Sequence, residues 1–295
     1  MSTVFFLFLL HLSVGLLATL PLVPDRAGAK FFKFCSASAV LMTTAGLWLL
    51  YRRFGIEGGP AVLGDYGITF GAAAASLLFA VLYNRAQHFA WRAARRPLLG
   101  ASLAAGVASM IAASPSPDRA LVLAAAVTSA VLLGAAFSAM VLGHWYLVVL
   151  DLPIVALRRL TVLLAASLAA RALMVGIALF TVSGAYHAAA AVAVGRWDND
   201  GLFVWMRLLF GIAGPLSLIG FVWKTVEIRS TQSATGILYV QLFLVMAGEL
   251  LATYLRVSAG YPLRSIRRWP LRAPAAAPRW WPRRERPRPA PGAER

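Results

Sequence analysis

The sequence is poor in the residues that usually carry metal and redox chemistry. It contains one cysteine, Cys35, and four histidines. A single cysteine excludes an internal disulfide and any zinc or iron–sulfur site with several cysteine ligands. The Walker phosphate-binding loop, the G-x-S-x-G nucleophile motif and the H-E-x-x-H zinc motif are also missing. We therefore expect none of these catalytic centres, and the sequence leaves open whether the protein is an enzyme.

Charge is scarce as well. Only 13% of the residues are Asp, Glu, Lys or Arg, whereas 60% are hydrophobic and the mean hydropathy is +0.74. A soluble domain of this size needs more polar surface, so the excess apolar surface must face lipid. The sequence predicts an all-α, polytopic transmembrane helical bundle, placed in a bacterial-type inner (plasma) membrane with the lipid bilayer as its surroundings.

Long apolar runs define the expected spans, because a helix of about 20 apolar residues crosses a bilayer. Eight runs predict eight spans, at residues 4–20, 31–50, 67–83, 97–113, 120–142, 156–182, 202–223 and 235–254. The third and fourth are short and rich in Ala and Gly, which favours close helix packing in lipid. The region 120–182 is almost unbroken, and a re-entrant turn near Asp151 and Pro153 would change the count by one.

The basic residues predict the orientation, because Lys and Arg accumulate in cytoplasmic loops. With eight spans, one side of the membrane holds eleven of them: Arg26, Lys30, Lys33, Arg85, Arg92, Arg95, Arg96, Arg158, Arg159, Lys224 and Arg229. The other side holds four: Arg52, Arg53, Arg119 and Arg196. We therefore expect the first side to be cytoplasmic and both termini to be external.

The last residues differ in composition from the rest. We expect a transmembrane helical domain over residues 1–260 and a basic tail rich in Pro, Arg and Trp over residues 261–295. Proline at this density prevents helix and the charge prevents collapse, so the tail is expected to be disordered and to contact anionic lipids or a partner. The net charge of +17 is spread over this tail and short loops. No aromatic-interleaved basic groove is present, so we expect no nucleic-acid binding.

Three ionisable residues fall inside the apolar runs: Arg171, Arg207 and Glu249. Charges at membrane depth are costly and usually mark a ligand site, an ion path or an internal brace. At about 1.5 Å per residue, Arg207 and Glu249 lie about 8 Å from the outer ends of their spans and Arg171 about 16 Å. Glu249 is therefore expected to pair with Arg207 or Arg171. The trio is a brace between helices, or a ligand-binding site whose spare positive charge attracts an anion or a quinone carbonyl, or a set of side chains that snorkel to the membrane interface.

The seventh span contains Gly214 and Pro215. Proline removes one backbone donor from a helix and clashes with the preceding turn, and glycine eases unwinding. Transporters expose backbone to substrates at such helix breaks, although proline kinks also occur in membrane helices without that role. A helix break at Gly214 and Pro215 is therefore predicted, with a functional or a structural meaning.

A second candidate ligand-binding site lies on the expected cytoplasmic face, at His144, Arg158, Lys224 and Arg229. Ser230, Thr231 or Ser233 can cap the following helix, whose N-terminal amides would attract a phosphate, a lipid headgroup or a quinone head. An ordinary capped helix with positive-inside residues explains the same pattern. Haem is not expected, because the four histidines provide no convincing pair at matched depth. No metal site is expected either.

Three functions fit these features. We expect first a subunit that binds a quinone or another lipid-soluble ligand in a redox-linked membrane complex with other membrane subunits. A secondary transporter of a small anionic solute and a non-catalytic assembly subunit are the alternatives. The sequence identifies no other cofactor.

Overall fold

The computed structural model describes residues 1–52, 66–89, 91–113, 119–149, 152–181 and 199–258. The chain divides into two units, Met1–Arg264 and Ser265–Arg295, and all the described residues belong to the first. The expected basic tail lies outside the described residues, so its disorder stays a prediction.

Within the described ranges the protein is all-α, and its helices follow the eight predicted runs. The bounds are α1 Ser2–Thr19, α2 Gly28–Tyr51, α4 Gly67–His88, α5 Arg92–Ala112, α6 Arg119–Tyr146, α7 Val155–Thr181, α9 Asn199–Leu208, α10 Gly214–Glu227 and α11 Thr231–Ser258. A five-residue π-helical segment, η4 Leu209–Ala213, joins α9 to α10 into one continuous rod. Short 3-10 turns at Leu20–Leu22 and Asp25–Ala27 connect α1 to α2.

Seven of these helical stretches are long and apolar enough to cross a bilayer. The remaining rod, α5, begins with Arg92, Arg95 and Arg96 and continues as an Ala-rich helix through Ala112. Helices suit this environment because each satisfies its own backbone hydrogen bonds where no water is available. The architecture is that of a multi-pass integral membrane protein.

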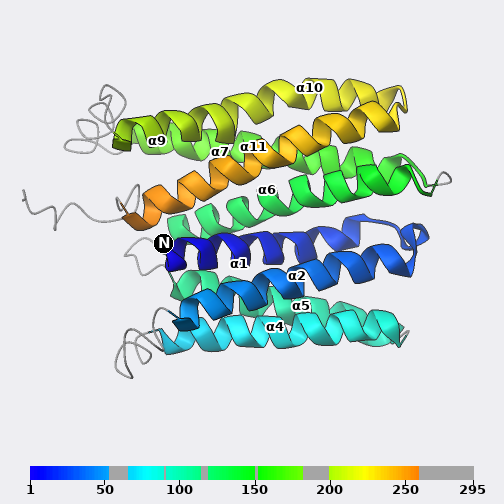
Figure 1. Ribbon diagram of the computed structural model, residues 1–295, viewed down its shortest axis with the longest axis horizontal. Helices are drawn as coiled ribbons and strands as arrows, with labels where there is room; N and C mark the ends of the chain where they lie inside the picture. Colours follow the sequence, from blue (N-terminus) through cyan, green and yellow to red (C-terminus); the bar gives the residue numbers. More distant parts are fainter. Residues whose placement is uncertain (53–65, 90, 114–118, 150–151, 182–198, 259–295) are drawn as a thin grey trace, which may run out of the picture. The chain divides into compact units, whose positions relative to one another are not determined.

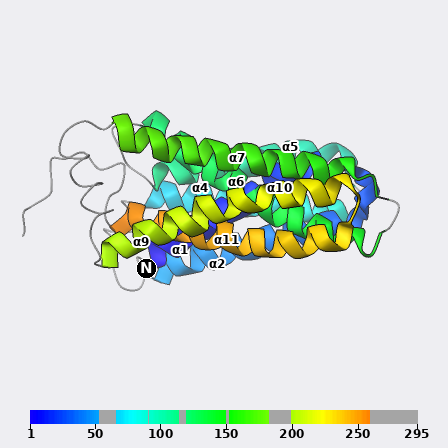
Figure 2. The same ribbon diagram turned by 90° about the horizontal axis from the view of Figure 1, so that it is seen from above.

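Successive rods run antiparallel and side by side (Figures 1 and 2). The connections α1–α2, α4–α5, α6–α7 and α10–α11 therefore gather at one end of the bundle. All eleven basic residues predicted to be cytoplasmic belong to this end, which we call the basic end. α6 and α7 are two separate antiparallel helices, so residues 120–146 and 155–181 each form one rod.

Helix α1 lies at the centre of the bundle. It contacts α2, α5, α6 and α11. Of its most apolar 18 residues 78% are buried, whereas only 11% are buried in the corresponding part of Gly201–Glu227. Its contact with α6 depends on Gly15 and Gly134: a Cβ built on Gly15 would lie 1.7 Å from the Ala130 carbonyl oxygen. Small residues allow helix backbones to approach this closely in lipid. A hydroxyl pair, Thr19 and Ser138 at 2.5 Å, joins the same two helices nearer the basic end.

Candidate functional site

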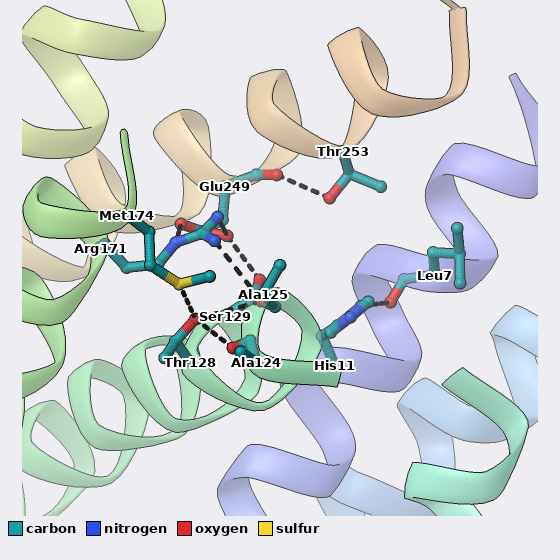
Figure 3. A network of polar contacts seen from close by, with 10 residues as sticks. All are labelled: Leu7, His11, Ala124, Ala125, Thr128, Ser129, Arg171, Met174, Glu249 and Thr253. Atoms are coloured by element: carbon teal, nitrogen blue, oxygen red, sulfur yellow. Dashed lines mark hydrogen bonds and ion pairs between the residues drawn. The ribbon is translucent and has the colours of Figure 1, made fainter. Parts of the chain in front are cut away.

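Arg171 on α7 and Glu249 on α11 form a buried ion pair (Figure 3). Nε of Arg171 donates to Oε1 of Glu249 at 2.8 Å, and Nη2 donates to Oε2 at 2.6 Å. Arg171 is 5% exposed and Glu249 is 4% exposed. A bidentate contact of this kind is stronger and more directional than a single hydrogen bond. The pairing was expected for either arginine, and it is Arg171 that makes it.

Helix α6 completes the surroundings of this pair. The Ser129 hydroxyl donates to Oε2 of Glu249 at 2.5 Å, and Nη1 of Arg171 contacts the Ala125 carbonyl oxygen at 3.4 Å (Figure 3). Three helices, α6, α7 and α11, therefore meet at one carboxylate. A buried charge is tolerated when a partner charge and further hydrogen bonds satisfy it, as they do here.

Positive charge exceeds negative charge at this position. The guanidinium groups of Arg207 and Arg256 both lie within electrostatic range of Glu249 and Arg171. Among the described residues, no hydrogen bond or ion pair engages the guanidinium of Arg207 or that of Arg256. Arg256 stands seven residues after Glu249, two turns along the same face of α11. Three arginines thus share one glutamate, whose direct contacts with an arginine go to Arg171, and the group carries an excess of positive charge.

A small cavity lies beside the pair. Its volume is about 10 Å³, and it is lined by Arg171, Val175, Arg207, Gly211, Ile212, Gly248 and Glu249. A void of this size has room for about one water molecule. All three ionisable residues singled out in the sequence therefore line one cavity, which we call the charged cavity.

One wall of the charged cavity is formed where η4 contacts α11. A Cβ built on Gly248 would lie 2.0 Å from the Gly211 Cα, so the two backbones are in direct contact. Gly211 and Ile212 belong to the π-helical segment. π-Helical segments are rare in proteins, and those that do occur are often found at functional sites.

The predicted helix break lies at the end of this segment. Gly214 has right-handed helical angles (φ −59°, ψ −55°), its N–H donates to the Leu209 carbonyl, and Pro215 occupies the first turn of α10. The chain thus stays helical through Gly214 and Pro215, and the irregularity is a π-helical segment. The Gln241 side chain on α11 donates to the Pro215 carbonyl at 3.1 Å, which fixes α10 against α11.

His11 on α1 is a further buried ionisable side chain near this group (Figure 3). It is 1% exposed, its Nδ1 lies 2.5 Å from the Leu7 carbonyl oxygen, and its Nε2 has no partner among the described residues. His88 and His144 are exposed at the basic end, and His187 lies outside the described residues. The described histidines are therefore not brought together in pairs, and the described residues contain no group of three or more metal-ligating side chains.

The second predicted site is distributed over the basic end. His144, Arg158, Lys224 and Arg229 are all exposed. The Arg158 guanidinium lies 5.6 Å from the centre of the Trp223 ring, a cation–π contact that joins α7 to α10. Arg229 has a positive φ of 56° in the turn before α11. The four residues lie at the same end of the bundle. Of their contacts, the one between Arg158 and Trp223 holds α7 against α10.

Sequence reasoning missed Ser129, Gly248 and the electrostatic contribution of Arg256. The sequence signal for Gly248 was a small residue directly before Glu249. Comparison of the chain with protein-family models, with curated proteins and with solved structures gives no match.

Proposed function

We propose that this protein binds a small anionic solute at the charged cavity and transports it across a bacterial-type inner membrane. The observation that carries the proposal is Arg207, a cation at membrane depth that lines the cavity with no hydrogen bond or ion pair among the described residues. A cation in such a position is costly unless a negative group accompanies it. The Glu249 carboxylate lines the same cavity, but its two oxygens are hydrogen-bonded to Arg171. An anion in the cavity would supply a negative group to Arg207.

The size of the cavity limits the solute. About 10 Å³ admits a single water molecule or an ion of similar size. Small monovalent anions such as chloride, nitrate or formate suit the charge, and each is larger than a water molecule, so the cavity has to open to admit it. Arg171 is already held by Glu249, so Arg207 is the residue that we expect to contact the anion.

The neighbouring π-helical segment supports movement at this position. A π-helix bonds each carbonyl to the N–H five residues later, and an α-helix to the N–H four residues later. The backbone of η4 could therefore change to α-helical hydrogen bonding by a shift of one residue. Its contact with Gly248 is backbone against backbone, so no side chains interlock at this crossing, and the Gln241–Pro215 hydrogen bond is the contact that a shift of α10 against α11 would have to break. Transport requires two arrangements of this kind around a fixed site.

The quinone-binding redox subunit remains the second proposal. Its support is positional, since His144, Arg158, Lys224 and Arg229 lie at the end of the bundle where a quinone head would reside. Ligand pockets for molecules of that size have volumes of about 300–1,000 Å³. The charged cavity is far smaller, which favours the anion. The assembly-subunit alternative accounts for the Arg171–Glu249 brace but gives no reason for the uncompensated Arg207.

Anion efflux from proteoliposomes tests the proposal. The purified chain is reconstituted with internal chloride, nitrate or formate, and release is followed with ion-selective electrodes. We expect efflux of at least one of these anions above that of empty liposomes, and at least tenfold less with Arg207→Met, which preserves the apolar stem. Arg159→Met, at an exposed arginine of the basic end, is the matched control and should match the wild type.

Equal efflux by the wild type and by Arg207→Met would contradict the anion site. Mass spectrometry and absorbance of the same preparation address the redox alternative directly. A stoichiometric quinone that co-purifies with the wild type and is lost with Lys224→Gln would favour the redox subunit over the transporter.

A further inference from the structure

A second cavity opens on the lipid-facing side of the bundle, between α2 and α4. Its volume is about 380 Å³, within the range of small-molecule ligand sites. It is lined by Ala37, Val40, Leu41, Thr44, Val81, Asn84, Arg85 and His88. We call it the α2–α4 groove.

The lining residues follow one face of each helix. On α2 they recur at positions 37, 40, 41 and 44, and on α4 at positions 81, 84, 85 and 88, which is the spacing of a continuous helical stripe. Leu41 is 70% exposed, so this stripe is not covered by another helix of the described part. The groove therefore faces the hydrocarbon of the bilayer.

The two ends of the groove differ in chemistry. Asn84, Arg85 and His88 belong to the last turns of α4, at the basic end, whereas Val40, Leu41 and Val81 are apolar. Asn84 donates to the Lys33 carbonyl at 3.1 Å and to the Ser36 hydroxyl at 2.7 Å, which places it level with Ser36. From Ser36 to Thr44 the helix descends about 12 Å into the membrane. The groove is thus polar at the membrane surface and apolar below it.

The polar end carries unpaired positive charge. Asn84 uses its amide group to fix α4 against α2, and no hydrogen bond or ion pair among the described residues engages the side chains of Arg85 or His88. Lys30 and Lys33 lie on the adjoining turns of α2. Asp25 is the single acidic residue in the two sequence segments 20–36 and 81–96.

We infer that the α2–α4 groove binds an anionic phospholipid, with the phosphate of its headgroup at Arg85 and His88 and an acyl chain along Ala37, Leu41 and Val81. Each basic residue near the membrane surface attracts anionic lipid, whereas a quinone head is neutral and a phosphatidylcholine head has no net charge. The charge at the polar end therefore selects an anionic phospholipid. The site is separate from the charged cavity and does not depend on its function.

Native mass spectrometry of the full chain tests the inference. The delipidated protein in mild detergent is titrated with phosphatidylglycerol or with phosphatidylcholine of identical acyl chains, and the first bound lipid is quantified. We expect the wild type to bind phosphatidylglycerol more tightly. Arg85→Gln should weaken that binding about fivefold, the factor that one basic residue contributes at a membrane surface. Arg159→Gln, which removes an exposed arginine of α7 at the same end, should leave it unchanged.

A second variant tests the apolar part of the groove. Leu41→Trp fills the groove from an exposed position, so it should preserve folding and still weaken binding of phosphatidylglycerol. Equal binding of the two lipids by the wild type would overturn the inference. So would loss of binding with Arg159→Gln equal to that with Arg85→Gln, because the lipid would then respond to general charge. Recovery of a quinone in place of phospholipid from the natively purified protein would assign the groove to a different occupant.

Discussion

Arg171 and Glu249 lie 78 residues apart in the chain and meet through two parallel contacts, Nε to Oε1 at 2.8 Å and Nη2 to Oε2 at 2.6 Å. They belong to α7 and α11, and Ser129 adds α6 through the same carboxylate. The pair therefore fixes the relative depth of three helices. Removal of the pair should lower the stability of the bundle and weaken the binding of any ligand in the charged cavity.

Glu249→Gln should destabilise the protein by about 3–5 kcal/mol, because breaking a buried pair leaves the partner charge uncompensated. The thermal unfolding midpoint in detergent, measured with and without added anion, gives the comparison. The double variant Arg171→Gln/Glu249→Gln should recover part of the loss, since neither member is then left as a buried charge. A midpoint unchanged by Glu249→Gln would show that the pair is not a brace.

Ser129→Ala should cost about 1–2 kcal/mol, because the Glu249 carboxylate loses a charge-assisted hydrogen bond. Thr128→Val is the matched control on the same helix. Its hydroxyl donates to the Ala124 carbonyl of its own helix and contacts the sulfur of Met174, away from Glu249. Chemical denaturation of both variants in the same detergent separates the two effects, and equal losses would contradict a special role for Ser129.

Gly248→Ala should separate η4 from α11, because the new Cβ would lie 2.0 Å from the Gly211 Cα. We expect a loss of about 1–3 kcal/mol in the free energy of unfolding. Gly236→Ala lies on the same helix and has no atom within 4 Å of the added Cβ, so it should be neutral or slightly stabilising. If the two variants behave alike, the backbone contact is not close in the native protein.

His11→Leu should be tolerated, with a change below about 1 kcal/mol. The substitution removes an unpartnered buried Nε2 together with a local hydrogen bond to the Leu7 carbonyl. Replacing such a group by an apolar one of similar size is nearly neutral. Thermal unfolding checks the stability and anion efflux checks the function. A variant of normal stability that had lost efflux would place His11 in the transport path.

The orientation predicted from the basic residues can be tested by cysteine labelling. Cys35 is fully buried, so Cys35→Ala provides a cysteine-free background. Ser230→Cys reports the basic end and Gly67→Cys the opposite end, where Gly67 is exposed at the start of α4. An impermeant maleimide should label position 67 in intact cells and position 230 only after permeabilisation. The reverse pattern would place the basic end outside.

Hydropathy was sufficient to locate the helices. A segment that crosses the hydrocarbon must satisfy its backbone hydrogen bonds within one helix, and its side chains must be largely apolar over about 20 residues. Even α5 was found, since its three arginines are followed by sixteen helical residues without charge, 97–112. Depth along each helix also showed that Glu249 and an arginine could meet. Sequence position gives depth but not the rotation of a helix about its axis, and rotation is what selects Arg171 over Arg207.

The close backbone contacts were not predictable for the same reason. Gly211 with Gly248 and Gly15 with Gly134 are pairs between helices far apart in the chain, and glycine is frequent in membrane helices generally. Ser129 looked like any small residue of an Ala-rich span. The π-helical register of η4 depends on packing against α11, whereas Pro215 alone suggested only a local break.

The central position of α1 also has a consequence for biogenesis. Its buried faces are completed by α6 and α11, which follow it in the chain by more than a hundred residues, as the Thr19–Ser138 contact shows. During insertion α1 is therefore made long before the helices that enclose it, and lipid or the insertion machinery must cover polar groups such as His11 and Ser13 in the interval. Assembly of the bundle has to wait for its last helix, so an early halt in translation leaves the innermost surface of the protein exposed to the membrane.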